Sequence, residues 1–130
     1  MLSLDESAHI SIVLEEGARA TVVCLCQGTG KIVIHQEAHV ATGAHLHWIN
    51  VTLGGGIEQT LVSTCTGDGA VSTIDWAFRA SDHEHQTLRA HNIFSAGHGG
   101  GEVTMKGVAE DAAHVAASGM IEIGLKGAGT

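Results

Sequence analysis

The sequence predicts an all-β fold, and within that class a parallel β-helix of about four to five coils. Three observations lead to this prediction. Short runs rich in Val, Ile, Thr and Leu alternate with glycine-containing turns about every 8–14 residues, a spacing that is typical of all-β proteins. Glycine occurs 18 times while proline is absent, and only 3% of residues are aromatic. Finally, Gly-Ala dipeptides recur along the chain at a fixed interval.

Each predicted strand is a short β-type run that ends at a glycine or Asx turn. In chain order these runs are Ile10–Leu14, Thr21–Leu25, Lys31–His35, Leu46–Leu53, Thr60–Thr64, Val71–Phe78 and Met120–Leu125. The alanines of Val108–Ser118 are compatible with a helix. However, Gly107 and Gly119 bracket that segment closely, so a further strand pair fits it at least as well.

The repeat favours a β-helix over other all-β folds. Gly17-Ala18, Gly43-Ala44 and Gly69-Ala70 are separated by two equal 26-residue steps, and a third such step reaches Ser95-Ala96. A unit of this length is too short for a propeller blade but suits one coil, stacked on the next at about 4.8 Å. The alternative is a β-sandwich or jelly roll with evenly spaced hairpins, which would usually carry edge prolines and core aromatics.

Length, charge and cysteine content restrict the classes of function. The 130 residues form a single predicted domain spanning 1–130, with a net charge of -8 and only six Lys and Arg. Nucleic-acid binding requires clustered cations, so it is not expected. No apolar run reaches the length of a membrane helix or forms a leading signal peptide, so no membrane partner is expected. Three cysteines, an odd number, predict reduced thiols and a cytoplasmic protein.

No motif for enzymatic chemistry is present. Gly28-Thr29-Gly30-Lys31 resembles the end of a phosphate-binding loop, but Leu25 and Ile32 stand where that motif needs Gly and Ser or Thr. There is no serine nucleophile elbow and no carboxylate pair with distinguishable acid and base roles. The sequence therefore predicts a protein that is not an enzyme.

The ends of a coil stack carry unpaired backbone groups. A chain this short must cover those ends with irregular segments or pair them with another subunit. The fold therefore predicts a homo-oligomer.

Two histidine pairs are candidate metal ligands. His45 and His47, and likewise His83 and His85, are two residues apart and would share one face of a strand. Paired imidazoles suit Zn, Cu, Fe or Ni. Alternatively, these pairs are surface histidines that bind no metal.

The 26-residue interval also places three possible cofactor ligands above one another. His39, Cys65 and His91 are separated by this same interval, so a regular stack would place them in one ladder. Thiolate and imidazole together suit zinc or an iron–sulfur cluster. The alternative is a ladder of satisfied polar side chains, which a one-residue shift in any coil would break. Cys24 and Cys26 are expected to be buried structural residues.

Short glycine-based motifs follow one another in a characteristic order and spacing between His39 and Ile123. These are Gly43-Ala44-His45-Leu46-His47-Trp48, Val51-Thr52-Leu53-Gly54-Gly55, Gly67-Asp68-Gly69-Ala70, the segment Asp82–His91, Lys106-Gly107-Val108 and Gly119-Met120-Ile121-Glu122-Ile123. In these motifs the region resembles the core domain shared by SufB and SufD, the scaffold components of the SUF system for iron–sulfur cluster assembly.

This resemblance implies a right-handed parallel β-helix and a non-catalytic scaffold that handles an iron–sulfur cluster. It also implies two partners, a SufC-like ATPase and a SufB- or SufD-like subunit. Two other functions stay open from the residues alone. One is a small metal-binding β-protein that uses the histidine pairs, and the other is an oligomerisation module without a cofactor.

Overall fold

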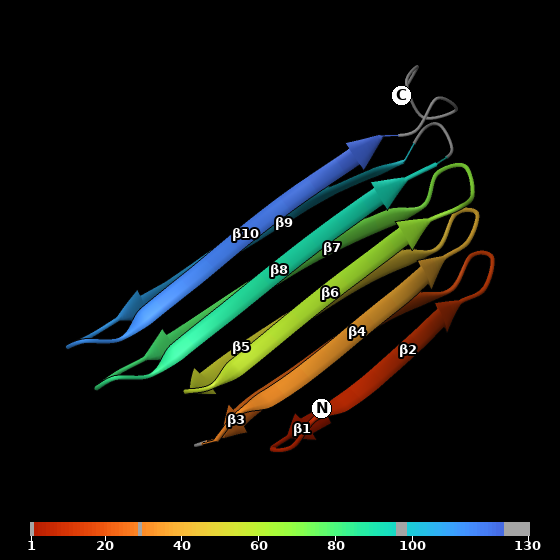
Figure 1. The fold of residues 1–130 in the computed structure, drawn as a ribbon. Coiled ribbons are helices and arrows are strands. Elements are labelled where there is room, and N and C mark those ends of the chain that lie inside the picture. Colours follow the sequence, from red (N-terminus) through yellow and green to blue (C-terminus); the bar gives the residue numbers. More distant parts are fainter. Residues whose placement is uncertain (1, 29, 96–98, 124–130) are drawn as a thin grey trace.

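The protein is a stack of β-strands wound into a flattened solenoid (Figure 1). The computed structural model describes residues 2–28, 30–95 and 99–123. The strands are β1 (Leu2–Leu4), β2 (Ala8–Leu14), β3 (Arg19–Gly28), β4 (Ile32–Val40), β5 (His45–Gly54), β6 (Ile57–Cys65), β7 (Val71–Ala80), β8 (His85–Phe94), β9 (Gly100–Ala109) and β10 (His114–Ile123). No helix occurs among the residues described, so the segment that is compatible with a helix contains strand instead.

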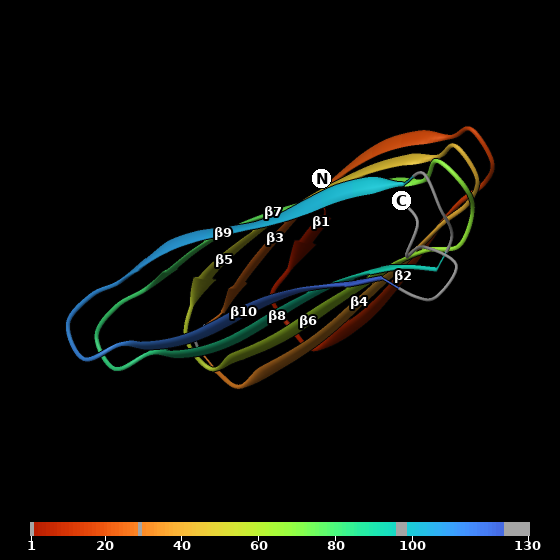
Figure 2. The same cartoon turned by 90° about the horizontal axis from the view of Figure 1, so that it is seen from above.

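Successive strands alternate between two sheets, which lie face to face (Figure 2). One sheet has the order β1-β3-β5-β7-β9 and the other β10-β8-β6-β4-β2, and each has five strands. Neighbouring strands in both sheets run parallel. Each coil thus contributes one strand to each sheet. The predicted parallel β-helix of about four to five coils is confirmed, and the sandwich or jelly-roll alternative is wrong.

The coil length varies along both sheets. Arg19 pairs with His45 and His45 with Val71, so two successive coils follow the Gly-Ala repeat. The step from Ile32 to Ile57 is one residue shorter than the repeat, and the step from Ile57 to Gln86 is three residues longer. The repeat therefore gives the correct coil from β3 to β7 in the first sheet, whereas the next step in that sheet, from Val71 to Gly100, is three residues longer. Its third step ends at Ala96, which lies outside the described residues.

Three strands have little or no counterpart among the predicted runs, namely β1, β8 and most of β9. β8 carries the polar residues Arg89, His91 and Asn92, so it lacks the apolar and β-branched run from which a strand is predicted. It forms because β6 and β10 pair with it on both sides, so the ladder satisfies its backbone groups. The predicted strand Met120–Leu125 falls within β10 as far as Ile123, and its last two residues lie outside the described part of the chain.

Side chains that point between the two sheets form the core. The burial pattern alternates along most strands, as the two-residue period of a strand requires. The largest buried side chains include Trp48, Trp76, Leu61, Ile74 and Leu88. Two tryptophans thus fill the centre of a core that is otherwise made largely of small aliphatic residues.

A buried polar network also crosses this core. Gln36 of β4 and Asn50 of β5 exchange two side-chain hydrogen bonds of 3.2 and 2.9 Å. Gln59 of β6 donates to the Gln36 carbonyl at 2.9 Å and accepts from the Thr52 hydroxyl at 2.7 Å. The Trp76 indole donates to Thr52 at 2.9 Å. Because these groups satisfy one another, they can be buried without a large desolvation penalty.

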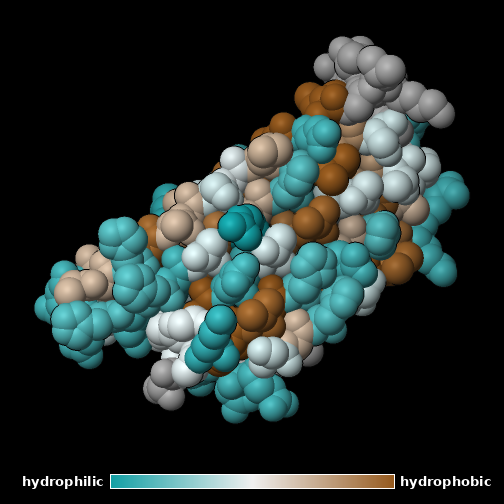
Figure 3. Space-filling view, in the orientation of Figure 1, coloured by the Kyte–Doolittle hydropathy of each residue, from teal (hydrophilic) through white to brown (hydrophobic). Residues whose placement is uncertain are grey.

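The last coil leaves apolar side chains exposed. Met120, Ile121 and Ile123 of β10 are 58%, 48% and 57% exposed. Ile121 and Ile123 also line a cavity of about 120 Å³ beside Phe94. In Figure 3 hydrophobic residues gather at the upper right of the molecule, where Figure 1 places the end of β10. Within the described residues, no neighbouring strand covers the outer edges of β9 and β10.

Among the residues the structure describes, no helix has the length and hydropathy that a membrane span requires.

Candidate functional site

The predicted ladder of His39, Cys65 and His91 does not form. His39 lies opposite Thr64, because the step from β4 to β6 is one residue shorter than the repeat. Cys65 instead pairs with Val40 on one side and Phe94 on the other, and it faces the core. His39 and His91 are on the outward face, so the register separates them from the thiol. The structure brings no two of the three together as register partners, and their individual ligand roles stay predictions.

The thiols are buried and protonated in the folded protein. Cys24, Cys26 and Cys65 are at most 1% exposed, so the predicted burial of the first two is confirmed. Desolvation by burial raises the pKa of Cys65 to about 11. Desolvation and, secondarily, the nearby Cys24 raise the pKa of Cys26 to about 12. Since the thiolate is the form that binds metals, these interior positions disfavour metal binding in the folded chain.

His91 has a carboxylate as its neighbour. Its Nε2 atom is buried and lies 3.1 Å from Oε2 of Glu122 on β10, an ion-pair contact without hydrogen-bond alignment. This contact crosses from β8 to β10 on the outward face.

The His45–His47 pair lies on the outward face of β5, as the spacing predicts. Both side chains line an open depression of about 390 Å³ together with Arg19. His47 Nε2 lies 2.6 Å from Oδ2 of Asp75 on β7, and both side chains are nearly half exposed. One imidazole nitrogen of this pair is therefore already engaged by a carboxylate.

The prediction that His83 and His85 share one face of a strand is wrong. β8 begins at His85, and His83 lies in the turn before it. The ring of His85 instead lies beside that of its register partner His114, with 5.8 Å between centroids and a tilt of 34°. The structure thus pairs His85 with the next coil.

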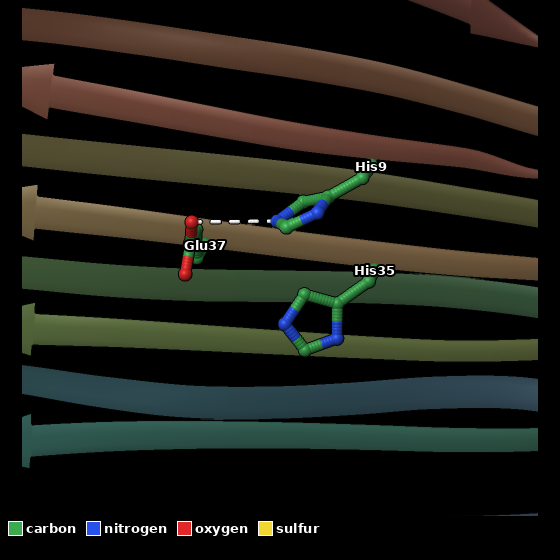
Figure 4. A group of neighbouring side chains, drawn as sticks. All are labelled: His9, His35 and Glu37. Atoms are coloured by element: carbon green, nitrogen blue, oxygen red, sulfur yellow. Dashed lines mark hydrogen bonds and ion pairs between the residues drawn. The ribbon is translucent and has the colours of Figure 1, made fainter.

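A further group of ligand-type side chains, not anticipated from the sequence, gathers on the outward face of β2 and β4. His9 and His35 are register partners, and Glu37 follows His35 by two residues on the same face. One ligand atom from each of these three residues lies within 4.8 Å of the other two. Figure 4 shows both rings and the carboxylate on one side of the sheet. We call these three residues the His9 cluster.

The contacts within the His9 cluster are close and solvent-accessible. His9 Nε2 lies 3.3 Å from Oε1 of Glu37, and the side chains are 61% and 35% exposed. The rings of His9 and His35 meet edge to face at 4.9 Å and 86°. The sequence does carry a signal for this group, because the interval between His9 and His35 equals that of the Gly-Ala repeat.

Comparison with protein-family models gives one match that spans nearly the whole chain. The model is described as the SufBD core domain of SUF-system FeS cluster assembly, and it matches residues 6–130. Neither the curated proteins nor the solved structures gave a match. The family match starts before the region of resemblance found in the motifs and includes β2 and the His9 cluster. The chain therefore belongs to the SufBD core-domain family of the SUF iron–sulfur cluster assembly system.

Proposed function

We propose that this protein is a non-catalytic scaffold subunit of the SUF system that works in the cytoplasm with a SufC-like ABC-type ATPase. The observation that carries the proposal is the family match over residues 6–130. The parallel solenoid supports it, because its stacked strands present extended outward faces, as a platform for other subunits requires.

The open edge of the last coil supports a partner of the same kind. Ile121 and Ile123 expose apolar surface, and β9 and β10 present unpaired backbone groups at their outer edges within the described residues. A sheet edge of this type is satisfied by another strand. We assign this edge to a second SufBD-type chain, with a second copy of this protein as the occupant.

An iron–sulfur cluster would be the cargo of such a scaffold. The three buried thiols give it no ready thiolate, and Cys65 becomes a ligand only if the core around it opens. Cluster loading on this chain therefore depends on a partner subunit. The partner completes the site either by supplying thiolate ligands or by docking on this chain.

The test is anaerobic reconstitution with ferrous iron and sulfide, performed on the chain alone and on the chain co-expressed with a SufC-like ATPase. The proposal expects a stable complex, seen by light scattering, and a visible-range chromophore in the complex. Cys65→Ser and His91→Ala should weaken the chromophore if these residues are ligands, whereas His114→Ala serves as the matched control. Absence of any complex with the ATPase would overturn the proposal.

A further inference from the structure

We propose that the His9 cluster is a binding site for one divalent first-row transition-metal ion of intermediate hardness, such as Zn²⁺ or Fe²⁺. This site is separate from any cluster cargo, and the proposal does not depend on the function proposed above. Two imidazole nitrogens and one carboxylate oxygen converge there, a donor set that suits these ions.

The spacing of the donor atoms fits such an ion. In a tetrahedral zinc site the ligand atoms lie about 2.0–2.1 Å from the metal, and two of them are then about 3.3 Å apart. His9 Nε2 and Glu37 Oε1 are 3.3 Å apart. The ligand atom of His35 lies within 4.8 Å of both, so a rotation of exposed side chains brings it into the coordination sphere.

The backbone holds these side chains in register before any ion arrives. β2 and β4 are paired from Ala8 to Leu14, and His9 sits directly beside His35 within that ladder. Glu37 is fixed on the same face by the two-residue period of β4. Binding therefore orders only a few side-chain torsions, which keeps its entropic cost small.

The local charge favours a cation. The chain has a net charge of -8, and the strands β2, β4 and β6 contain no Lys or Arg. No ammonium or guanidinium on these strands therefore competes for the Glu37 carboxylate or repels an incoming metal ion. The exposure of the cluster also leaves coordination positions free for water or a small anionic ligand.

Other histidine groups in the described residues offer fewer donors. His47 meets only Asp75, and His85 meets only His114. The His9 cluster is the group that brings three ligand-type residues together within the described part of the chain. This difference makes a site-specific test possible, since the chain contains its own histidine controls.

The test titrates Co²⁺ and Zn²⁺ into tag-free protein that has been stripped of metal with a chelator. Co²⁺ binding is followed by its visible absorption, and Zn²⁺ affinity is measured in competition with a chromophoric chelator. We expect one equivalent of either ion to bind. His9→Ala and His35→Ala should each lower the affinity at least about tenfold, and Glu37→Gln should lower it because the charge is lost.

His114→Ala is the matched control, since it also removes an exposed histidine that contacts another imidazole across two strands. It should leave the stoichiometry and affinity unchanged. All four side chains are solvent-accessible, and circular dichroism verifies that the variants fold. The proposal is overturned if no saturable one-to-one binding occurs, or if His9→Ala and His35→Ala bind like the wild type. It is equally overturned if His114→Ala lowers the affinity as much as they do.

Discussion

At the scale of single residues, the interior position of Cys65 controls how its thiol titrates. Burial raises its pKa from 9.0 to about 11, so the folded protein holds the proton to a higher pH than the unfolded chain does. The stabilising contribution is complete below pH 9 and is lost as the pH rises through 11. The thiol is therefore a source of alkaline instability.

We expect the free energy of unfolding to fall by about 1 kcal/mol between pH 8 and pH 10 because of this thiol alone. Urea unfolding at both pH values, in the wild type and in Cys65→Ala, measures the effect. The variant loses stability at both pH values through the volume it removes, so the informative quantity is the difference between the two pH values. An identical pH dependence in the two proteins would contradict the assigned burial of the thiol.

The sequence predicts the strand face on which a residue lies better than it predicts which residues lie beside it in the neighbouring coils. The sequence places His45 and His47 on one face of a strand, which the structure bears out, because that inference needs only the two-residue period. Placing His39 beside Cys65 requires the coil length to stay constant, and a single missing residue moves the thiol to the opposite face. Contacts between coils depend on turn lengths, which composition does not specify.

At the scale of elements, two glycines with positive φ angles differ in how closely the neighbouring coil approaches them. Gly54, at the end of β5, has a φ angle of +101°, and a Cβ atom there would collide with the backbone carbonyl of Gly28 in the neighbouring coil. Gly17 also has a positive φ, of +73°, but no other atom lies within 4 Å of the place that a Cβ would occupy. Substituting alanine at each glycine therefore distinguishes the cost of a left-handed backbone from the added cost of a steric collision.

Gly17→Ala should cost about 1 kcal/mol of unfolding free energy, because only the left-handed backbone is penalised. Gly54→Ala should cost more than about 2 kcal/mol, since the turn must also move away from its neighbour. Urea unfolding curves of the two variants provide the comparison. Equal losses would show that the stacked turns are not in the close contact described.

The elements themselves could be predicted where their pattern is local. Runs such as Leu46–Leu53 lie within β5 because alternating burial selects β-branched and aliphatic residues. β8 could not be found in this way, since Gln86 and Asn92 occupy inward positions that usually hold apolar residues. Gln86 donates to the carbonyls of Gly54 and Arg79, so local tertiary hydrogen bonds make its burial tolerable.

At the scale of the whole molecule, the two ends of the stack differ in what they expose. The last coil presents Ile121 at 48% exposure beside Ile123, whereas the outward face of β2 has the isolated Val13 at 67%. Contiguous apolar surface beside an open sheet edge marks an association site, while single exposed residues do not.

We expect the protein to self-associate at micromolar concentration, and Ile121→Lys to convert it to a monomer. Association would bury the lysine ammonium without an opposite charge to pair with it, and this desolvation cost opposes association. Val13→Lys adds the same charge at the other end and should leave the mass unchanged. Light scattering coupled to size exclusion measures all three proteins. A wild-type protein that is strictly monomeric contradicts this use of the edge.

The amide network of Gln36, Asn50 and Gln59 has a consequence for how the stack comes apart. A solenoid can lose its coils one at a time from an end, because each coil contacts only its neighbours. Here the hydrogen bonds tie β4, β5 and β6 together across both sheets, and Thr52 extends the connection to Trp76 of β7. We therefore expect fraying that begins at β10 to stop at this network, because the coils that share its hydrogen bonds open together.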